Sequence, residues 1–205
     1  MNYAMHLVAD AGLLATLAYL GTVLARILTS DARSFADGPP AGRPAIAFII
    51  GFAALGGLCV GVRDAGVTEL AMAAMLTIAL AGICYADVRC GLIPDVFTLA
   101  PLAAVLAGDL LLHQWHALIA VALVAAPFSI AAKFSRGRGM GWGDVKLVAL
   151  GAAVLGAESA LLAFTGACFV AVAVAIWRRR RSVPIAFAPY LALGIAVVLA
   201  LRGIA

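Results

Sequence analysis

The sequence predicts an all-α, polytopic integral membrane protein, and two observations carry this prediction. Of the 205 residues, 65% are hydrophobic and only 12% are charged, whereas a soluble domain is about half apolar and about a quarter charged. The mean hydropathy is +1.12, and apolar runs of roughly 18 to 22 residues recur along the chain, each long enough to cross a hydrocarbon core of about 30 Å as a helix. The net charge of +4 is therefore no argument for nucleic acid binding.

We expect about eight transmembrane helices within a single membrane-embedded domain, 1–205. The sixth, with about 14 residues, is too short to span a bilayer alone, so we expect either a tight turn at Ala157–Ser159 or a kinked pair with the seventh helix. The expected ranges are 5–27, 44–62, 67–86, 95–112, 115–133, 144–157, 159–177 and 184–202.

The basic residues predict how these helices are oriented, because Lys and Arg accumulate in short cytoplasmic loops. If eight helices span, the connections from odd to even helices hold 12 of the 14 basic residues. This split predicts that both termini lie on the non-cytoplasmic side and that Asp87 and Asp144 lie at the cytoplasmic surface. The 12 residues are Arg26, Arg33, Arg43, Arg89, Lys133, Arg136, Arg138, Lys146 and the run Arg178 to Arg181, which we expect to anchor the topology and to contact lipid phosphate.

Two carboxylates stand out because they occupy opposite kinds of helix end. Asp87 follows the third apolar run, where the helix dipole disfavours negative charge, and Asp144 begins the sixth helix, where unpaired N–H groups favour the ionised form. Two carboxyl groups brought together cannot both ionise cheaply, so the pair would share one proton near neutral pH. One would then act as base toward water while the other, protonated, polarises a carbonyl, which is the chemistry of aspartyl peptide hydrolysis.

The residues around these carboxylates fit that use. Gly141 and Gly143 remove side chains beside Asp144, which lets another backbone approach closely. Pro94 opens the next helix near its first turn, a position that proline favours. The structural alternative is that Asp144 is an N-cap and Asp87 an ordinary loop charge, and spacing by itself leaves both interpretations open.

Other residues suited to chemistry have simpler interpretations. Asp10, one turn from His6, and Asp109, close to His113, are expected to make polar contacts near the outer face, although carboxylates within spans are candidates for function. No CxxC pair is present, so we expect no zinc site, no disulfide framework and no cofactor. The four cysteines are Cys59, Cys84, Cys90 and Cys168.

Four blocks of the sequence resemble the type IV prepilin peptidase family, whose members are polytopic aspartyl proteases of the GxGD type. "GWGD", Gly141 to Asp144, resembles the GxGD motif, and "GDVKLVALGAAVLG" resembles the region that follows it. "DVRCGLIPDVFTLAPL", from Asp87, is similar to the block of the first aspartate, and "PIAFAPYLALG", from Pro184, to the C-terminal helix. The blocks follow the family's order over roughly residues 80–200.

The resemblance implies that Asp87 and Asp144 are the catalytic pair and that Gly141, Gly143, Pro94 and Lys146 belong to the supporting motif. The role of Lys146 stays open among snorkelling to the interface, pairing with a carboxylate and contacting lipid phosphate. The implied substrate is a prepilin or pseudopilin precursor whose short basic leader is removed after a glycine. Cleavage is expected at the cytoplasmic face of the inner membrane, in a type IV pilus or protein secretion system.

One departure from the family pattern limits the expected activity. Many bifunctional members carry a cytoplasmic insertion with two CxxC pairs, associated with methylation of the new N-terminus, whereas the first loop here has no cysteine. We therefore expect no N-methyltransferase activity. The compact form is similar to the peptidases of tight-adherence (Flp) pilus systems.

Four alternatives remain open from the sequence. A small proton-coupled transporter would use the two aspartates as relay groups, expected near the bilayer midplane beside broken helices. A GxGD protease acting on other membrane peptides would carry a "PAL" motif, which is absent. A scaffold would have no need of both aspartates, and a metal-dependent phosphotransferase would use Asp87, Asp95 and Asp144 around Mg²⁺ and respond to chelators.

Overall fold

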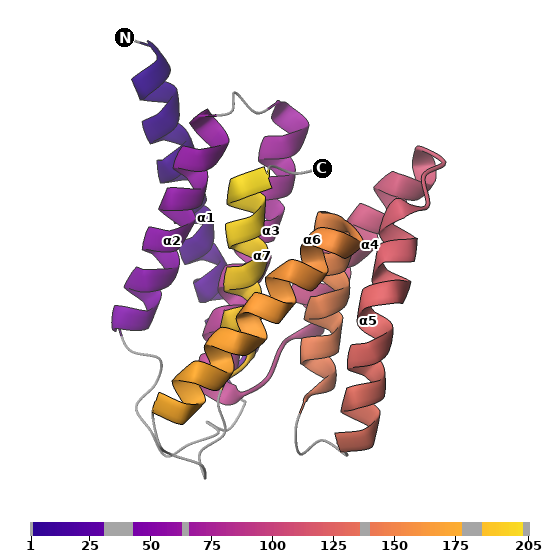
Figure 1. Cartoon of the computed structure of the whole chain (residues 1–205). Helices are drawn as coiled ribbons and strands as arrows, with labels where there is room; N and C mark the ends of the chain where they lie inside the picture. Colours follow the sequence, from indigo (N-terminus) through magenta and orange to yellow (C-terminus); the bar gives the residue numbers. More distant parts are fainter. Residues whose placement is uncertain (1, 31–42, 63–65, 136–139, 178–185, 203–205) are drawn as a thin grey trace. The chain divides into compact units, whose positions relative to one another are not determined.

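A computed structural model describes residues 2–30, 43–62, 66–135, 140–177 and 186–202. This described part is entirely helical, without strands, which confirms the predicted all-α class (Figure 1). The arginine run Arg178–Arg181 and much of the first polar loop lie outside the described residues. The helices are α1 (Asn2–Leu28), α2 (Arg43–Val62), α3 (Val67–Cys90), α4 (Asp95–Leu111), α5 (His116–Ser135), α6 (Trp142–Trp177) and α7 (Ala188–Arg202).

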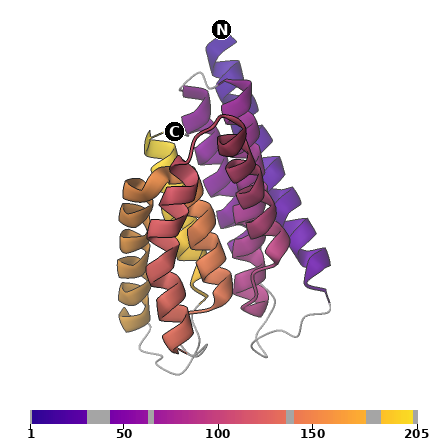
Figure 2. The same ribbon diagram turned by 90° about the vertical axis from the view of Figure 1, so that its right-hand side faces the viewer.

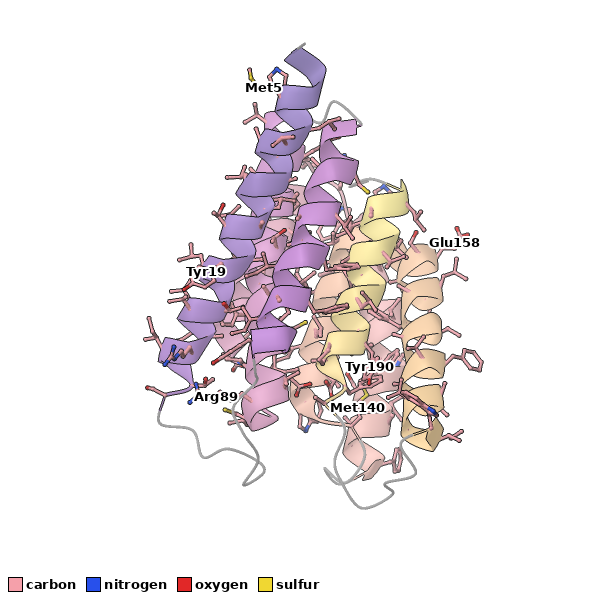
Figure 3. The ribbon with its side chains drawn as sticks, turned by 90° about the vertical axis from the view of Figure 1, so that its left-hand side faces the viewer. Met5, Tyr19, Arg89, Met140, Glu158 and Tyr190 are labelled. Carbon is pink, nitrogen blue, oxygen red and sulfur yellow. The ribbon has the colours of Figure 1, made fainter. Side chains whose placement is uncertain are left out.

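Four segments of the described helices are long and apolar enough to cross a membrane: Met5–Leu28, Val67–Cys90, His116–Phe134 and Trp142–Trp177. The apolar stretches Ala45–Gly57 and Ala188–Leu201 are shorter. Many large apolar side chains are exposed on the outer faces of these helices, as Tyr19 is on α1 (Figure 3). An apolar surface of this extent suits lipid better than water. The count of eight spans and the sides of the two termini stay predictions.

The chain forms two compact units, each with its own helix packing. The first contains α1, α2, α3 and the start of α4, and the second runs from Thr98 to Leu199. In the first unit α1 packs against both α2 and α3. The contacts are close because glycines face backbone: a Cβ at Gly57 would meet the carbonyl oxygen of Asp10 at 2.5 Å, and one at Gly21 would collide with the backbone of Ile78. Small residues at such crossings let membrane helices approach closely.

In the second unit, α5 packs against α6 (Figure 2). Gly156 interrupts α6 with φ 74° and ψ 167°, a conformation that only glycine adopts readily. The helix therefore has two segments, Trp142–Leu155 and Ala157–Trp177, that turn back on one another (Figure 1). The prediction of a kinked pair is confirmed, whereas a turn at Ala157–Ser159 is wrong, because those residues are helical and the break lies at Gly156.

Asp109, near the end of α4, makes hydrogen bonds to the loop that follows and to the start of α5. Its carboxylate oxygen Oδ2 accepts a hydrogen bond from the N–H of Ala117, in the first turn of α5, at 2.9 Å. Its carbonyl oxygen accepts one from the N–H of Gln114 at 2.8 Å. Between them, His113 takes a positive φ of 56°. Asp109 is thus a cap and loop clamp, which is a structural role.

Candidate functional site

Asp87 lies inside α3, one turn before its end. The helix continues to Cys90, four residues beyond the expected end, and stops where Gly91 takes the left-handed conformation (φ 63°, ψ 23°). The Gly91 N–H donates to the carbonyl oxygen of Asp87 at 2.8 Å, a common way to satisfy the last carbonyls of a helix. Only 8% of Asp87 is exposed. The interpretation of Asp87 as a loop charge is therefore wrong: it is a buried carboxyl in the last helical turn.

The connection from α3 to α4 is short and well packed. Pro94 lies directly before the first residue of α4, Asp95, and its carbonyl oxygen accepts from the N–H of Phe97 at 3.1 Å. The ring of Phe97 is buried against Gly82 of α3, where an added Cβ would come within 2.7 Å of it. The tight packing of Phe97 fixes how the chain folds back after Asp87. All of this lies in the first unit.

Asp144 lies in the first turn of α6, in the second unit. The helix begins at Trp142, so Gly141 is the cap residue and Asp144 the third helical residue. The Gly141 N–H donates to Oδ2 of Asp144 at 3.2 Å, while the Gly141 carbonyl accepts from the N–H of Val145 at 3.4 Å. Asp144 is thus not the N-cap itself: it reaches back to the cap residue, as the acidic member of a capping box does.

Gly141 is not held by tight packing against Asp144. A Cβ at Gly141 would meet the Asp144 carboxylate at 3.6 Å, an ordinary contact distance, and its φ is not positive. The local fold therefore does not require glycine at 141. Gly143 and Lys146 are both half-buried within the first turns of α6. That Gly141 leaves room for another backbone beside Asp144 stays a prediction.

The described residues were also compared with the requirements of a metal site. Within the described segments of the chain, no three His, Cys, Asp or Glu residues gather in a way that could hold a metal ion. Cys84 and Cys90, three residues before and after Asp87 on α3, are free thiols, as are Cys59 and Cys168. Asp87 belongs to the first unit and Asp144 to the second, so their pairing stays a prediction.

A comparison with protein families decides the class of protein. Residues 74–176, slightly more than half of the chain, match the type IV leader peptidase family. The chain belongs to the type IV leader peptidase family. A comparison with curated proteins gave no match, and a comparison with solved structures gave none.

Family membership confirms the resemblance seen in the sequence and makes the chain a protease in class. The matched stretch includes Asp87, Pro94, Gly141, Asp144 and Lys146. The "PIAFAPYLALG" block from residue 184 lies beyond it. Family membership favours a protease over the transporter and scaffold alternatives. Together with the apolar helices, membership in this leader peptidase family indicates a membrane protein.

Proposed function

We propose that the protein is an aspartic endopeptidase that removes the short basic leader from prepilin or pseudopilin precursors, with Asp87 and Asp144 as its catalytic residues. The observation that carries this proposal is the family match over residues 74–176, which contains both carboxyls. Each lies within one turn of a helix end, Asp87 at the end of α3 and Asp144 at the start of α6. Helix ends are where side chains of membrane helices reach water.

Chain connectivity supports a meeting of the two carboxyls. Asp87 lies eight residues before the first residue of α4, and Asp144 nine residues after the last residue of α5. Within the second unit, the part of α4 from Thr98 onward and α5 form a helical hairpin that the Asp109 clamp closes (Figure 2). In the sequence, short connections lead from Asp87 to the start of α4 and from the end of α5 to Asp144. If the hairpin spans the bilayer, both carboxyls belong to one membrane face, which the basic loops predict to be the cytoplasmic one.

The proposed reaction needs only these two groups and water. One carboxylate takes a proton from a water molecule, whose oxygen attacks the carbonyl carbon of the scissile peptide bond, while the other, protonated, carboxyl donates its proton to the carbonyl oxygen. The resulting tetrahedral intermediate then collapses, the C–N bond breaks, and the proton first taken from water passes to the departing amine. The carbonyl oxygen returns its proton to the second carboxyl, so one water is added and the pair is regenerated. No metal takes part in these steps.

The fold suits a substrate that is half in lipid. A prepilin leader is short and basic and precedes an apolar helix, so its cleavage site falls where the helix leaves the membrane. Gly141 leaves space beside the Asp144 carboxylate, where an extended substrate backbone would lie. The cytoplasmic interface, the inner membrane location and the absence of N-methyltransferase activity are parts of this proposal.

The test is cleavage by the purified protein in detergent, scored as loss of the leader by mass spectrometry over a panel of prepilins. We expect the parent to cleave at the leader junction with or without a chelator. Asp87→Asn and Asp144→Asn each remove a proton-transfer group and should lower the rate by about 10²- to 10⁴-fold. Asp109→Asn is the matched control, because the amide oxygen still accepts from Ala117.

The outcomes separate the parts of the proposal. Full cleavage by either Asp87→Asn or Asp144→Asn would show that the catalytic pair is assigned wrongly. An equal loss in Asp109→Asn would show that the effect is structural rather than catalytic. Inhibition by the chelator, restored by added Mg²⁺, would favour metal-dependent chemistry. A folded parent that cuts none of the prepilins would point to other membrane peptides as substrates.

A further inference from the structure

The tryptophans of the second unit stand at the ends of its membrane-length segments. Trp142 and Trp177 are the first and last residues of the α6 segment, and Phe134 is the last residue of the α5 segment, His116–Phe134. All three are exposed: 59% for Trp142, 84% for Trp177 and 82% for Phe134. Trp115, 56% exposed, directly precedes α5 at its opposite end. Exposed tryptophans that bracket apolar helices are typical of membrane interfaces, because the amphipathic indole ring sits at headgroup level.

Three of these residues lie at one end of the unit, two of them because α6 breaks at Gly156. Since α6 turns back there, its first and last residues both lie at the end away from the turn (Figure 1). The end of α5 lies beside the start of α6 (Figures 1 and 2). Glu158, next to the turn, and Met140, just before α6, lie at opposite ends of the unit (Figure 3). Phe134, Trp142 and Trp177 thus form one aromatic end of the second unit, which we call the aromatic end.

Segment lengths agree with a membrane-spanning placement of this unit. The 19-residue segment of α5 is about 28 Å long and the 21 residues of Ala157–Trp177 about 31 Å, at 1.5 Å per residue. Both match a hydrocarbon core of about 30 Å. With the aromatic end at one interface, α5 reaches the other side, where Trp115 lies next to its start. The first segment of α6, Trp142–Leu155, has 14 residues and is about 21 Å long, so from Trp142 at the interface it ends short of the other side. The second segment runs obliquely to the first (Figure 1), so its greater length covers a similar depth.

Basic residues next to the aromatic end indicate which kind of lipid surface it contacts. Lys133, exposed, precedes Phe134. In the sequence, Arg136 and Arg138 follow Phe134 within four residues, and the run Arg178–Arg181 begins directly after Trp177. Basic residues next to a span attract anionic lipid headgroups. We propose that the aromatic end of the second unit lies in the headgroup layer of an anionic leaflet, where the ring of Trp142 holds the start of α6, and with it Asp144, at interfacial depth.

This inference makes Trp142 a positioning residue for the proposed reaction, and this part rests on the proposed function. Trp142 and Asp144 are two residues apart in the first turn of one helix, so the depth of the indole sets the depth of the carboxylate. An Asp144 that moved deeper would lose water, and one that moved outward would lose the substrate's helix end. Small displacements of a reacting group are costly, since about 1 Å can lower a rate by about 10²-fold.

The first test measures depth without using activity. The chain has three tryptophans, so replacing two by phenylalanine leaves one reporter in the full protein. Each reporter is placed in vesicles of anionic and zwitterionic phospholipid whose acyl chains are brominated either near the headgroup or near the chain end. Trp142 and Trp177 should be quenched more by the shallow bromines than by the deep ones. As a control, Phe169→Trp in a tryptophan-free background, mid-way along the second α6 segment and 73% exposed as Phe, should show the reverse order.

The second test links depth to cleavage of prepilin in the same vesicles. Trp142→Ala should lower cleavage by on the order of 10- to 10²-fold, whereas Trp142→Tyr, which also seeks the interface, should restore most of it. Trp177→Ala, at the same end but far from Asp144 in sequence, should have a smaller effect.

The two tests overturn different statements. Stronger quenching of Trp142 by the deep bromines, or quenching by aqueous iodide with no effect of either lipid, would show that the aromatic end is not in the headgroup layer. If the parent cleaved nothing, the proposed function would fail while the depth result would stand. If the depth result held but Trp142→Ala cleaved like the parent, the positioning role would be wrong.

Discussion

The close approach of α1 and α2 predicts opposite effects for two neighbouring glycines. An alanine at Gly57 would place its Cβ 2.5 Å from the carbonyl oxygen of Asp10 and 2.6 Å from the Cα of Ala11, both backbone atoms that no rotamer change can move. An alanine at Gly56, the residue before it on α2, would meet nothing within 4 Å. The pair therefore isolates one helix contact with two identical chemical changes.

The magnitude follows from the same distances. To restore an ordinary contact of 3.4 Å, α1 and α2 would have to separate by about 0.9 Å at Gly57. Overpacking of this kind costs about 1–3 kcal/mol, and both substitutions gain about 1 kcal/mol because alanine is a better helix former than glycine. The gain cancels in the comparison, so Gly57→Ala should be less stable than Gly56→Ala by about 1–3 kcal/mol. For a chain of this length that corresponds to about 2–12 °C in Tm.

The assay is thermal unfolding of the purified variants in one detergent, followed by circular dichroism. Gly56→Ala should melt at or above the parent and Gly57→Ala below it. Equal Tm values for the two variants would refute the reasoning, because they would show that α1 and α2 do not pack at the distance that the structure gives. A Gly56→Ala variant that melts well below the parent would show that α2 makes a close contact at Gly56, which the structure does not have.

Three further predictions concern the second unit. Asp109→Ala removes the acceptor for the Ala117 N–H and should lower the stability by about 1 kcal/mol, with Asp109→Asn close to the parent in the same thermal assay. Gly156→Ala forces a side chain into a backbone conformation reserved for glycine and should cost about 1–3 kcal/mol; an unchanged Tm would argue against the break in α6. Gly141→Ala should lower the Tm only slightly, since its Cβ meets the Asp144 carboxylate at an ordinary 3.6 Å and alanine is a poorer N-cap than glycine. It should slow prepilin cleavage if a substrate backbone lies there. Cleavage at the parent's rate would show that the substrate approaches Asp144 from elsewhere.

The helices themselves were predictable from the sequence because they depend on local properties. Apolar runs bounded by glycine, proline and charge placed most helix ends within four residues of those observed, and the positions of Asp87 and Asp144 at opposite helix ends followed from the same boundaries. The local motifs also carried the family resemblance, which the match over residues 74–176 confirms. An exposed aromatic end was foreseeable in part, since tryptophans at the limits of apolar runs are visible in the sequence.

Contacts between distant residues were decided only by the tertiary structure. That Asp109 caps α5 depends on how the α4–α5 loop folds, and a neighbouring histidine in the sequence suggested a different partner. Gly57 faces the backbone of α1 while Gly56 faces open space, a difference that two adjacent glycines cannot reveal in the sequence. The extension of α3 through Asp87 to Cys90 required Gly91 to take a left-handed conformation, which glycine permits but does not impose. Hydropathy and motifs thus predict which segments are apolar enough to enter the membrane and which carboxyls stand at their ends. Close packing decides which surfaces meet, because contact distances depend on side chains far apart in the chain.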